Sequence, residues 1–107
     1  MSKTNKMKIP NKFKIFGQSW KIELVDLIDD DSDCEGRTYY DLNLIRLRSN
    51  KPHEYLEEVW LHEITHVALN ILGLNKLNKD ESKVDLIAHC FHQIFQTSEY
   101  GKTKKKK

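Results

Sequence analysis

The pentapeptide at residues 62–66 carries the residue types of a metal site. It reads HEITH, with His62 and His66 four positions apart. On a helix, positions i and i+4 lie one turn apart on the same face, so both imidazoles can reach one ion. Glu63 is turned aside by one residue, so its carboxylate can approach a metal-bound water without ligating the metal. The pattern predicts one Zn²⁺ per chain, with Glu63 as the general base.

A third ligand is required, because a catalytic zinc takes three protein ligands and keeps one open position. The best candidate is Glu81, near the start of the next predicted helix. Asp85 follows four residues later on the same face, where it can accept the second ring N–H of a ligating histidine. His89 lies on roughly that face too. It is either an alternative ligand or proton carrier, or a partly buried core histidine.

Two helices are predicted to position these side chains. Between Pro52 and Leu72 apolar residues recur at spacings of three and four, which is typical of a largely buried helix, and Gly73 ends it. After the linker at residues 74–79, Asp80 can cap the second helix. A glycine turn lets the two helices run antiparallel and brings Glu81 beside the HEITH face. The predicted apolar stripe of the second helix comprises Val84, Ile87, Ala88, Phe91, Ile94 and Phe95.

Strand patterns precede the helices. Residues 12–25 form two alternating runs split by Gly17-Gln18-Ser19, which is typical of a hairpin. Its predicted inward residues are Phe13, Ile15, Trp20, Ile22 and Leu24. Residues 37–48 are rich in β-formers and predict a further strand or hairpin. Strands followed by helices indicate an α+β domain with a small, mostly antiparallel sheet packed on two long helices.

Residues 29–36, DDDSDCEG, separate the strand patterns and predict a surface loop. The loop superficially resembles a calcium loop. However, Cys34 stands where the sharp-turn glycine belongs and Tyr40 where the bidentate glutamate belongs, which disfavours calcium. Tyr39 and Tyr40 can donate to an oxyanion from a strand beside the metal, although strand aromatics more often simply pack. Cys34 and Cys90 are interpreted as free thiols.

The charge is segregated along the chain. The formal net charge is +2, yet all 16 acidic residues lie between two basic ends. Those ends contain Lys3, Lys6, Lys8, Lys12 and Lys14, and Lys102 with Lys104, Lys105, Lys106 and Lys107. We expect a disordered basic N-terminus at 1–11, a single domain at 12–100 and a disordered Lys-rich tail at 101–107. An acidic body lacks the basic face that specific nucleic-acid binding requires.

The distribution of apolar residues disfavours a membrane-spanning or secreted protein. No run approaches the roughly 20 apolar residues of a bilayer helix. The basic start also lacks the apolar stretch and cleavage site of a secretory signal. We therefore expect a cytoplasmic protein without a membrane partner.

The HEITH helix followed by a helix carrying ExxxD resembles the gluzincin class of zinc peptidases, and most closely the small ImmA/IrrE-type metallopeptidases of phages and mobile elements. The similarity covers roughly residues 36–96. It implies a minimal zincin-like fold in which His62, His66 and Glu81 are ligands, Glu63 is the base and Asp85 supports a histidine. It also suggests a regulator as one protein substrate.

The expected activity is zinc-dependent hydrolysis of a peptide or protein substrate. An extended substrate would add as a strand along the edge near Asn43 to Arg48. The alternative is a zinc-stabilised binding module without activity, since a small domain gains folding free energy directly from a metal. Glu63 argues against the alternative, because a structural site needs no base between its ligands.

Overall fold

A four-stranded mixed sheet forms the first half of the domain in this computed structural model, which describes residues 6–101. Its strands are β1 (Lys12–Ile15), β2 (Gln18–Val25), β3 (Gly36–Tyr39) and β4 (Leu44–Arg48), in the spatial order β1-β2-β4-β3. The β1–β2 and β3–β4 pairs are antiparallel, and β2–β4 is parallel. The predicted hairpin at residues 12–25 is confirmed, with its turn at Phe16 and Gly17, which both have positive φ.

The strand order corrects the predicted edge. Residues 44–48 form β4, which pairs with β2 on one side and β3 on the other. Because β4 returns parallel to β2 and inserts beside it, β3 is left at the edge. The segment near Asn43 to Arg48 is therefore not available for strand addition, and β3 is.

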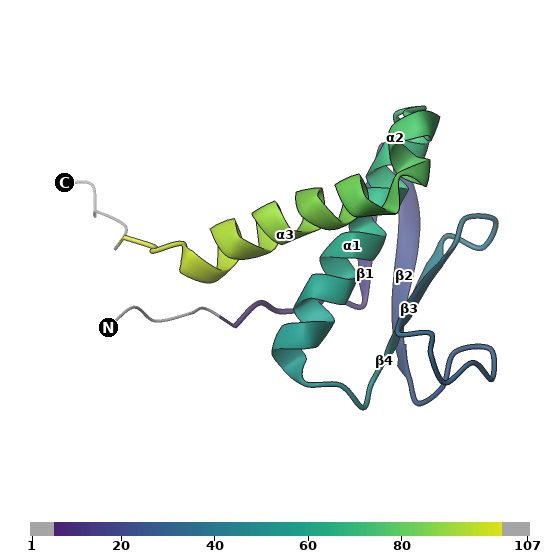
Figure 1. The fold of residues 1–107 in the computed structure, drawn as a ribbon, viewed down its shortest axis with the longest axis horizontal. Helices are drawn as coiled ribbons and strands as arrows, with labels where there is room; N and C mark the ends of the chain where they lie inside the picture. Colours follow the sequence, from purple (N-terminus) through teal and green to yellow (C-terminus); the bar gives the residue numbers. More distant parts are fainter. Residues whose placement is uncertain (1–5, 102–107) are drawn as a thin grey trace.

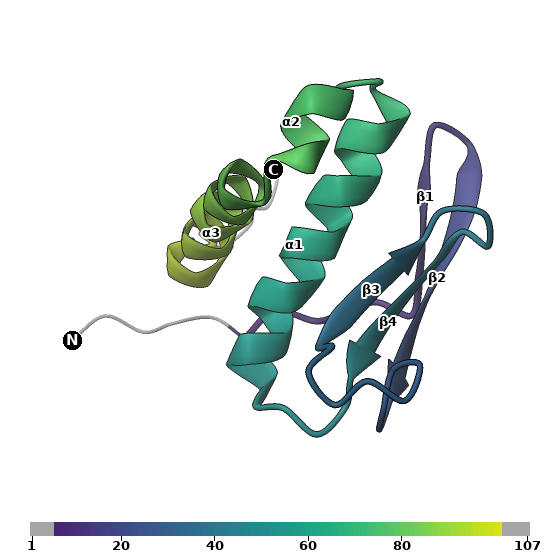
Figure 2. The same cartoon turned by 45° about the vertical axis from the view of Figure 1, so that its right-hand side comes forward.

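Three helices follow the sheet: α1 (His53–Ile71), α2 (Asn75–Lys79) and α3 (Glu81–Thr97). Helix α1 lies between the sheet and α3, so the domain has three layers (Figures 1 and 2). The α+β class is confirmed. The predicted linker forms the short helix α2, and the predicted cap is confirmed because the Asp80 side chain accepts from the Lys83 N–H at 3.3 Å.

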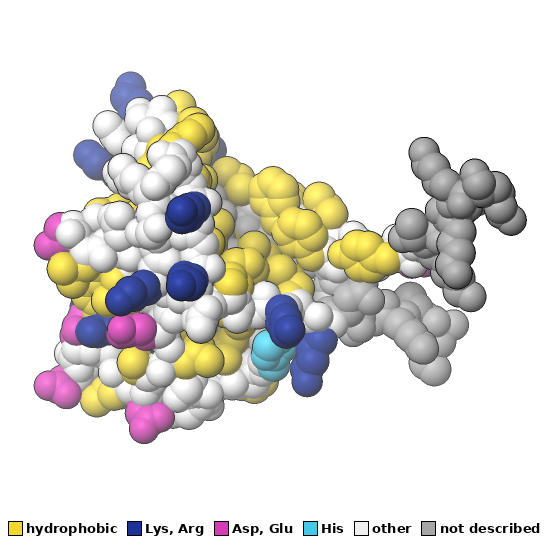
Figure 3. Space-filling model, turned by 180° about the vertical axis from the view of Figure 1, so that it is seen from behind, with side chains coloured by type: hydrophobic (Ala, Val, Ile, Leu, Met, Phe, Trp, Pro, Cys, Tyr) yellow, Lys and Arg dark blue, Asp and Glu magenta, His cyan; other side chains and the backbone are white. Residues whose placement is uncertain are grey.

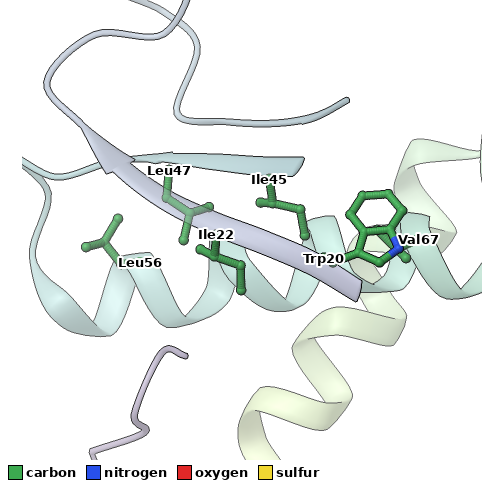
Figure 4. Packing of buried hydrophobic residues seen from close by; sticks show 6 residues of the cluster. All are labelled: Trp20, Ile22, Ile45, Leu47, Leu56 and Val67. Carbon is green, nitrogen blue, oxygen red and sulfur yellow. The ribbon is translucent and has the colours of Figure 1, made fainter. Parts of the chain in front are cut away.

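The main core lies between the sheet and α1. It consists of Trp20 and Ile22 from β2, Ile45 and Leu47 from β4, and Leu56 and Val67 from α1 (Figure 4). Leu24 is 55% exposed, so its predicted inward position is wrong. Alternation fixes the face on which a strand residue lies, but not how far a helix covers that face.

Helix α3 is only partly covered by α1. Val84 and Ala88 are buried, whereas Phe91 and Ile94 from the same predicted stripe are 47% and 53% exposed. Figure 1 shows the reason, because the second half of α3 projects away from the sheet. The helix was predicted, but the burial of its whole stripe was not borne out.

A buried ionisable cluster joins α1, α3 and the first described residues. Glu57, 1% exposed, lies 2.8 Å from Nε2 of His92 and accepts from the Met7 N–H at 3.0 Å. His53 Nε2 is 2.6 Å from the Met7 carbonyl. Both histidines thus lie within hydrogen-bonding distance of their neighbours in this cluster. Residues 1–5 and 102–107, within the predicted terminal segments, lie outside the described residues.

Within the described part of the chain, no helix combines the length and apolar character needed to cross a bilayer.

Candidate metal centre

His62, His66 and Glu81 converge at the junction of α1 and α3. The two ring centroids are 4.9 Å apart. Nε2 of His62 lies 3.1 Å from Oε1 of Glu81, and Nε2 of His66 lies 3.3 Å from it. One potential ligand atom from each residue lies within 4.8 Å of the others. This is the set predicted from HEITH and the following glutamate.

Local structure explains the convergence. The two histidines share a face of α1 because they are separated by four residues. Gly73, at φ +74°, ends α1, and α2 then redirects the chain. Asp80 caps α3, which places Glu81 in its first turn and points its carboxylate back at α1. A carboxylate there also interacts favourably with the helix dipole.

The remaining ring nitrogens test whether the site fits a metal. Nδ1 of His62 is 3.1 Å from Oδ1 of Asp85, and Nδ1 of His66 is 2.6 Å from Oδ1 of Asn78. Both partners are oxygen acceptors, so each Nδ1 can hold the ring proton, which would leave the Nε2 lone pairs for a metal beside Glu81. The two lone pairs and the Glu81 carboxylate are the donors that Zn²⁺ prefers. The residues present therefore fit the ion.

Asn78 was missed by the sequence reasoning. It lies in α2, a segment predicted to be a linker, and no residue spacing relates it to HEITH. The position of its side chain depends on how α2 folds back over the end of α1. Asp85, by contrast, was placed correctly beside a histidine of the pair.

The side chain of Glu63 extends from α1 to the edge strand β3 and is 8% exposed. Its Oε1 accepts a hydrogen bond of 2.6 Å from the Thr38 hydroxyl. Gly36 lies beside its other oxygen, since a Cβ at Gly36 would be 3.4 Å from Oε2 and only 2.5 Å from Cγ1 of Val59. The glycine therefore allows β3 to approach α1 closely.

The two tyrosines of interest have separate environments. The Tyr39 hydroxyl donates to Asp29 at 2.5 Å and is held in the acidic loop. Burial raises the pKa of Tyr40; its interaction with Asn78 lowers it, and the charges of Glu63 and Glu81 raise it. Tyr40 is thus the tyrosine that interacts with the site, and its net pKa shift is upward, which keeps the hydroxyl protonated.

His89 is not part of the triad. Its Nδ1 lies 3.7 Å from Oε1 of Glu58, and the side chain is 65% exposed. Among residues 6–101 neither cysteine belongs to the metal-ligating group: Cys34 donates to the Gly36 carbonyl at 3.4 Å, and Cys90 is exposed. Both thiols are free, as predicted.

A cavity of about 450 Å³ opens beside His62 and Glu63. Its walls come from α1, the start of β3, the acidic loop and Asp85 of α3. They comprise Asp33, Cys34, Glu35, Gly36, Tyr55, Glu58, Val59, His62, Glu63 and Asp85. The cavity is therefore open to Glu63 and to one of the two HEITH histidines.

No protein-family model, curated protein or solved structure matches the chain. The function is therefore inferred from the site's own chemistry. Two imidazole nitrogens and the Glu81 carboxylate form one group, and the cavity beside it is lined by Glu63 and by one of the two histidines, His62.

Proposed function

We propose that this chain is a zinc-dependent peptidase. One observation carries the proposal: the two Nε2 atoms of the HEITH histidines converge with Glu81, while Glu63 lines the adjacent cavity and is not one of the three clustered residues. A group that only stabilised the fold would have no use for a carboxylate held in that position. Zinc bound there would supply Lewis-acid activation of water and of a peptide carbonyl.

The likeness to gluzincins of the ImmA/IrrE type belongs to the same proposal. Its support is the placement of Glu81 and Asp85, one turn apart on α3, each directed at a HEITH histidine. The α+β architecture, with a sheet on one side of α1 and the glutamate helix on the other, is compatible with a minimal zincin-like domain.

Glu63 would act as general base. Its carboxylate takes a proton from the attacking water and delivers it to the leaving amine. The hydrogen bond from Thr38 engages Oε1, so Oε2 is the oxygen that would receive the proton. Tyr40, protonated and close to Glu63 and Glu81, would donate a hydrogen bond to the oxyanion that develops on the carbonyl.

An extended peptide would bind along β3. This strand is at the sheet edge, and its first residue, Gly36, lines the cavity beside Glu63. Main-chain pairing with β3 would hold the peptide antiparallel or parallel to the edge and bring a peptide bond to the site. The substrate is then a peptide or an unfolded protein segment in the cytoplasm.

The alternative function is a zinc-stabilised binding module. Its support is the position of the site, which joins α1 to α3 and would add stability to a helix pair that is otherwise partly exposed. Structural zinc sites usually close with a fourth protein ligand. The group here has three members among the described residues, which favours the enzyme.

A comparison of the wild type with Glu63→Gln tests the proposal. Glutamine cannot accept the proton, so cleavage of a broad peptide library should fall by about 10²- to 10⁴-fold while zinc content and fold persist. Mass spectrometry identifies the products, and elemental analysis measures zinc. A zinc-loaded wild type that cleaves nothing would favour the module, and undiminished cleavage by the variant would refute the mechanism.

A further inference from the structure

An apolar groove runs between α1 and α3. It encloses about 350 Å³ and is lined by Leu61, Ile64, Thr65, Ala68, Leu69, Ile87, Phe91 and Phe95. At 100° per residue, Ile87 and Phe91 flank the buried stripe of Val84 and Ala88 on one side of α3, and Asp85 and His89 flank it on the other. The groove is therefore separated by the helix from the acidic cavity of the metal centre.

The groove is extended by exposed apolar side chains. Phe91 and Phe95 stack with ring centroids 6.2 Å apart and are 47% and 39% exposed, and Ile94 beside them is 53% exposed. Figure 3 shows hydrophobic side chains along the projecting part of α3. Contiguous apolar surface of this kind on a soluble domain usually marks a binding site.

Positive charge lies at the distal end of the groove. Phe95 also lines a second hollow, together with Trp60, Tyr100 and the lysines Lys6 and Lys8. Both lysines are exposed, and no acidic side chain lines either hollow. A ligand that inserts apolar groups between α1 and α3 would therefore bind best if it also carried carboxylates that lie beside these two lysines.

We propose that the groove binds an acidic amphipathic helix of a partner protein. A helix laid against two others buries apolar residues at positions i, i+3, i+4 and i+7, which suits a groove bounded by α1 and α3. Its apolar face covers Phe91 and Ile94, and its acidic residues lie next to Lys6 and Lys8. The proposal does not depend on the peptidase activity.

Two other occupants fit less well. A second copy would offer its own α3, but the carboxylates of that helix are already engaged, Glu81 and Asp85 with the HEITH histidines and Asp80 with the helix N-terminus. A membrane surface favours helices with several basic residues along the polar face, but α3 itself carries Lys83 alone, and Lys6 and Lys8 lie only at one end of the groove. A separate acidic helix satisfies both the groove and the lysines.

Selection from a displayed library of amphipathic helical peptides tests the proposal with the full-length chain as bait. The peptides have the length of α3 and a fixed apolar stripe, and Glu, Lys, Gln or Ser are allowed at every other position. We expect the selected peptides to be rich in Glu. Selection of Lys-rich peptides, or of none above background, would overturn the proposal.

The best peptide is then measured by fluorescence anisotropy. Phe91→Ser and, separately, Ile94→Ser should each weaken binding by about tenfold or more, which is typical for a central apolar contact. Exchange of Lys6 and Lys8 for Glu should also weaken it and reduce its salt dependence. Leu42→Ser is the matched control, since Leu42 is 64% exposed but lies in the β3–β4 turn; it should bind as the wild type does.

Circular dichroism establishes that each variant is folded, and the two single variants keep the test valid if one of them fails to fold. Equal affinity for wild type, Phe91→Ser and Ile94→Ser would overturn the proposal. Sedimentation equilibrium that shows a dimer lost in Phe91→Ser would assign the groove to a second copy. Vesicles of phosphatidylcholine and phosphatidylserine that displace the peptide would assign it to a membrane, and either result would overturn the proposal.

Discussion

The hydroxyl of Thr38 donates a hydrogen bond of 2.6 Å to Oε1 of Glu63, and so ties the edge strand β3 to the centre of α1. A threonine hydroxyl is neutral and has one proton to give, so the bond orients the carboxylate without forming an ion pair. Because Glu63 is 8% exposed, few water molecules compete for that oxygen. The proposed base is thus held by a residue that lies 25 positions earlier in the chain.

Thr38→Val should lower peptidase turnover by about tenfold, the effect of losing one hydrogen bond to a charged group. Valine has nearly the shape of threonine, so fold and zinc content should persist. Initial rates on a peptide cut by the wild type provide the measurement. Thr97→Val is the control, because the Thr97 hydroxyl bonds only within α3. Equal rates for Thr38→Val and wild type would contradict the role of Thr38.

Gly36→Ala should impair both stability and turnover. The added Cβ would meet Cγ1 of Val59 at 2.5 Å, so either the Val59 side chain must shift or β3 must move away from α1 and from Glu63. Overpacking of this kind costs about 1–3 kcal/mol, which denaturant unfolding can measure. The double variant Gly36→Ala, Val59→Ala removes the colliding methyl and should recover much of the turnover. If the double variant is no better than Gly36→Ala alone, the close approach of β3 is not what the site requires.

Asn78 and Asp85 should each tune zinc affinity without binding zinc. They hold Nδ1 of His66 and of His62, so Asn78→Ala and Asp85→Ala should weaken zinc binding by about 10- to 100-fold. Competition with a chelator measures the affinity. Asn75→Ala, in the same short helix but exposed, should bind zinc as the wild type does. Wild-type affinity in the Asn78 variant would show that its contact with His66 has no role in binding.

Tyr40→Phe should lower kcat by about 10²- to 10³-fold, with a small change in KM and an unchanged zinc content. The reason is that Tyr40 would donate to charge that develops only in the transition state. Tyr39→Phe is the matched control, because the Tyr39 hydroxyl is engaged by Asp29. If Tyr39→Phe lowered kcat more than Tyr40→Phe, Tyr39 and not Tyr40 would be the donor to the oxyanion.

The parts of the site that the sequence predicted are those set by helical periodicity. Any two helical residues four positions apart share a face, so the spacing of His62 and His66 was enough to place them together. Asp80, as a helix cap, marks the start of the helix that carries Glu81 and Asp85. Thr38 and Gly36 could not be assigned in this way. Their roles depend on β3 being the edge strand, which follows from the parallel insertion of β4 beside β2, a pairing between segments distant in the chain.

The exposed half of α3 has a similar explanation. Periodicity identified Phe91 and Ile94 as members of an apolar stripe, but burial needs a partner surface, and the length and direction of α1 leave none for them. Asn78 was missed because α2 has no apolar periodicity of its own. Local sequence patterns thus predicted where the helices and strands lie and which of their residues share a face. The order of the strands and the part of each helix that is buried depend on contacts between distant segments, which local patterns do not contain.

Tyr55→Phe should alter the pH dependence of stability. The Tyr55 hydroxyl donates to Glu35, and this hydrogen bond, with burial and the Glu35 charge, raises the pKa of Tyr55 to about 12. The same bond is the main cause of the lowered pKa of Glu35. The stability that the Glu35 carboxylate contributes is therefore fully present above its unfolded pKa of about 4.3. It is lost as the pH falls through the lower pKa of the folded state. The stability that the protonated Tyr55 hydroxyl contributes is present below its unfolded pKa of about 10, and it is lost as the pH rises through about 12.

Wild type should consequently exceed Tyr55→Phe in stability between about pH 5 and pH 9, and the gap should narrow in acid and in strong alkali. The gap should stay below about 1 kcal/mol, because both side chains are partly exposed and solvent screens the pair. Urea unfolding across that range measures it, and absorbance at 295 nm should show the loss of the highest-pH tyrosine titration. Tyr100→Phe, at a residue 78% exposed, is the control. A gap independent of pH would mean that Tyr55 contributes packing alone and that its bond to Glu35 adds nothing.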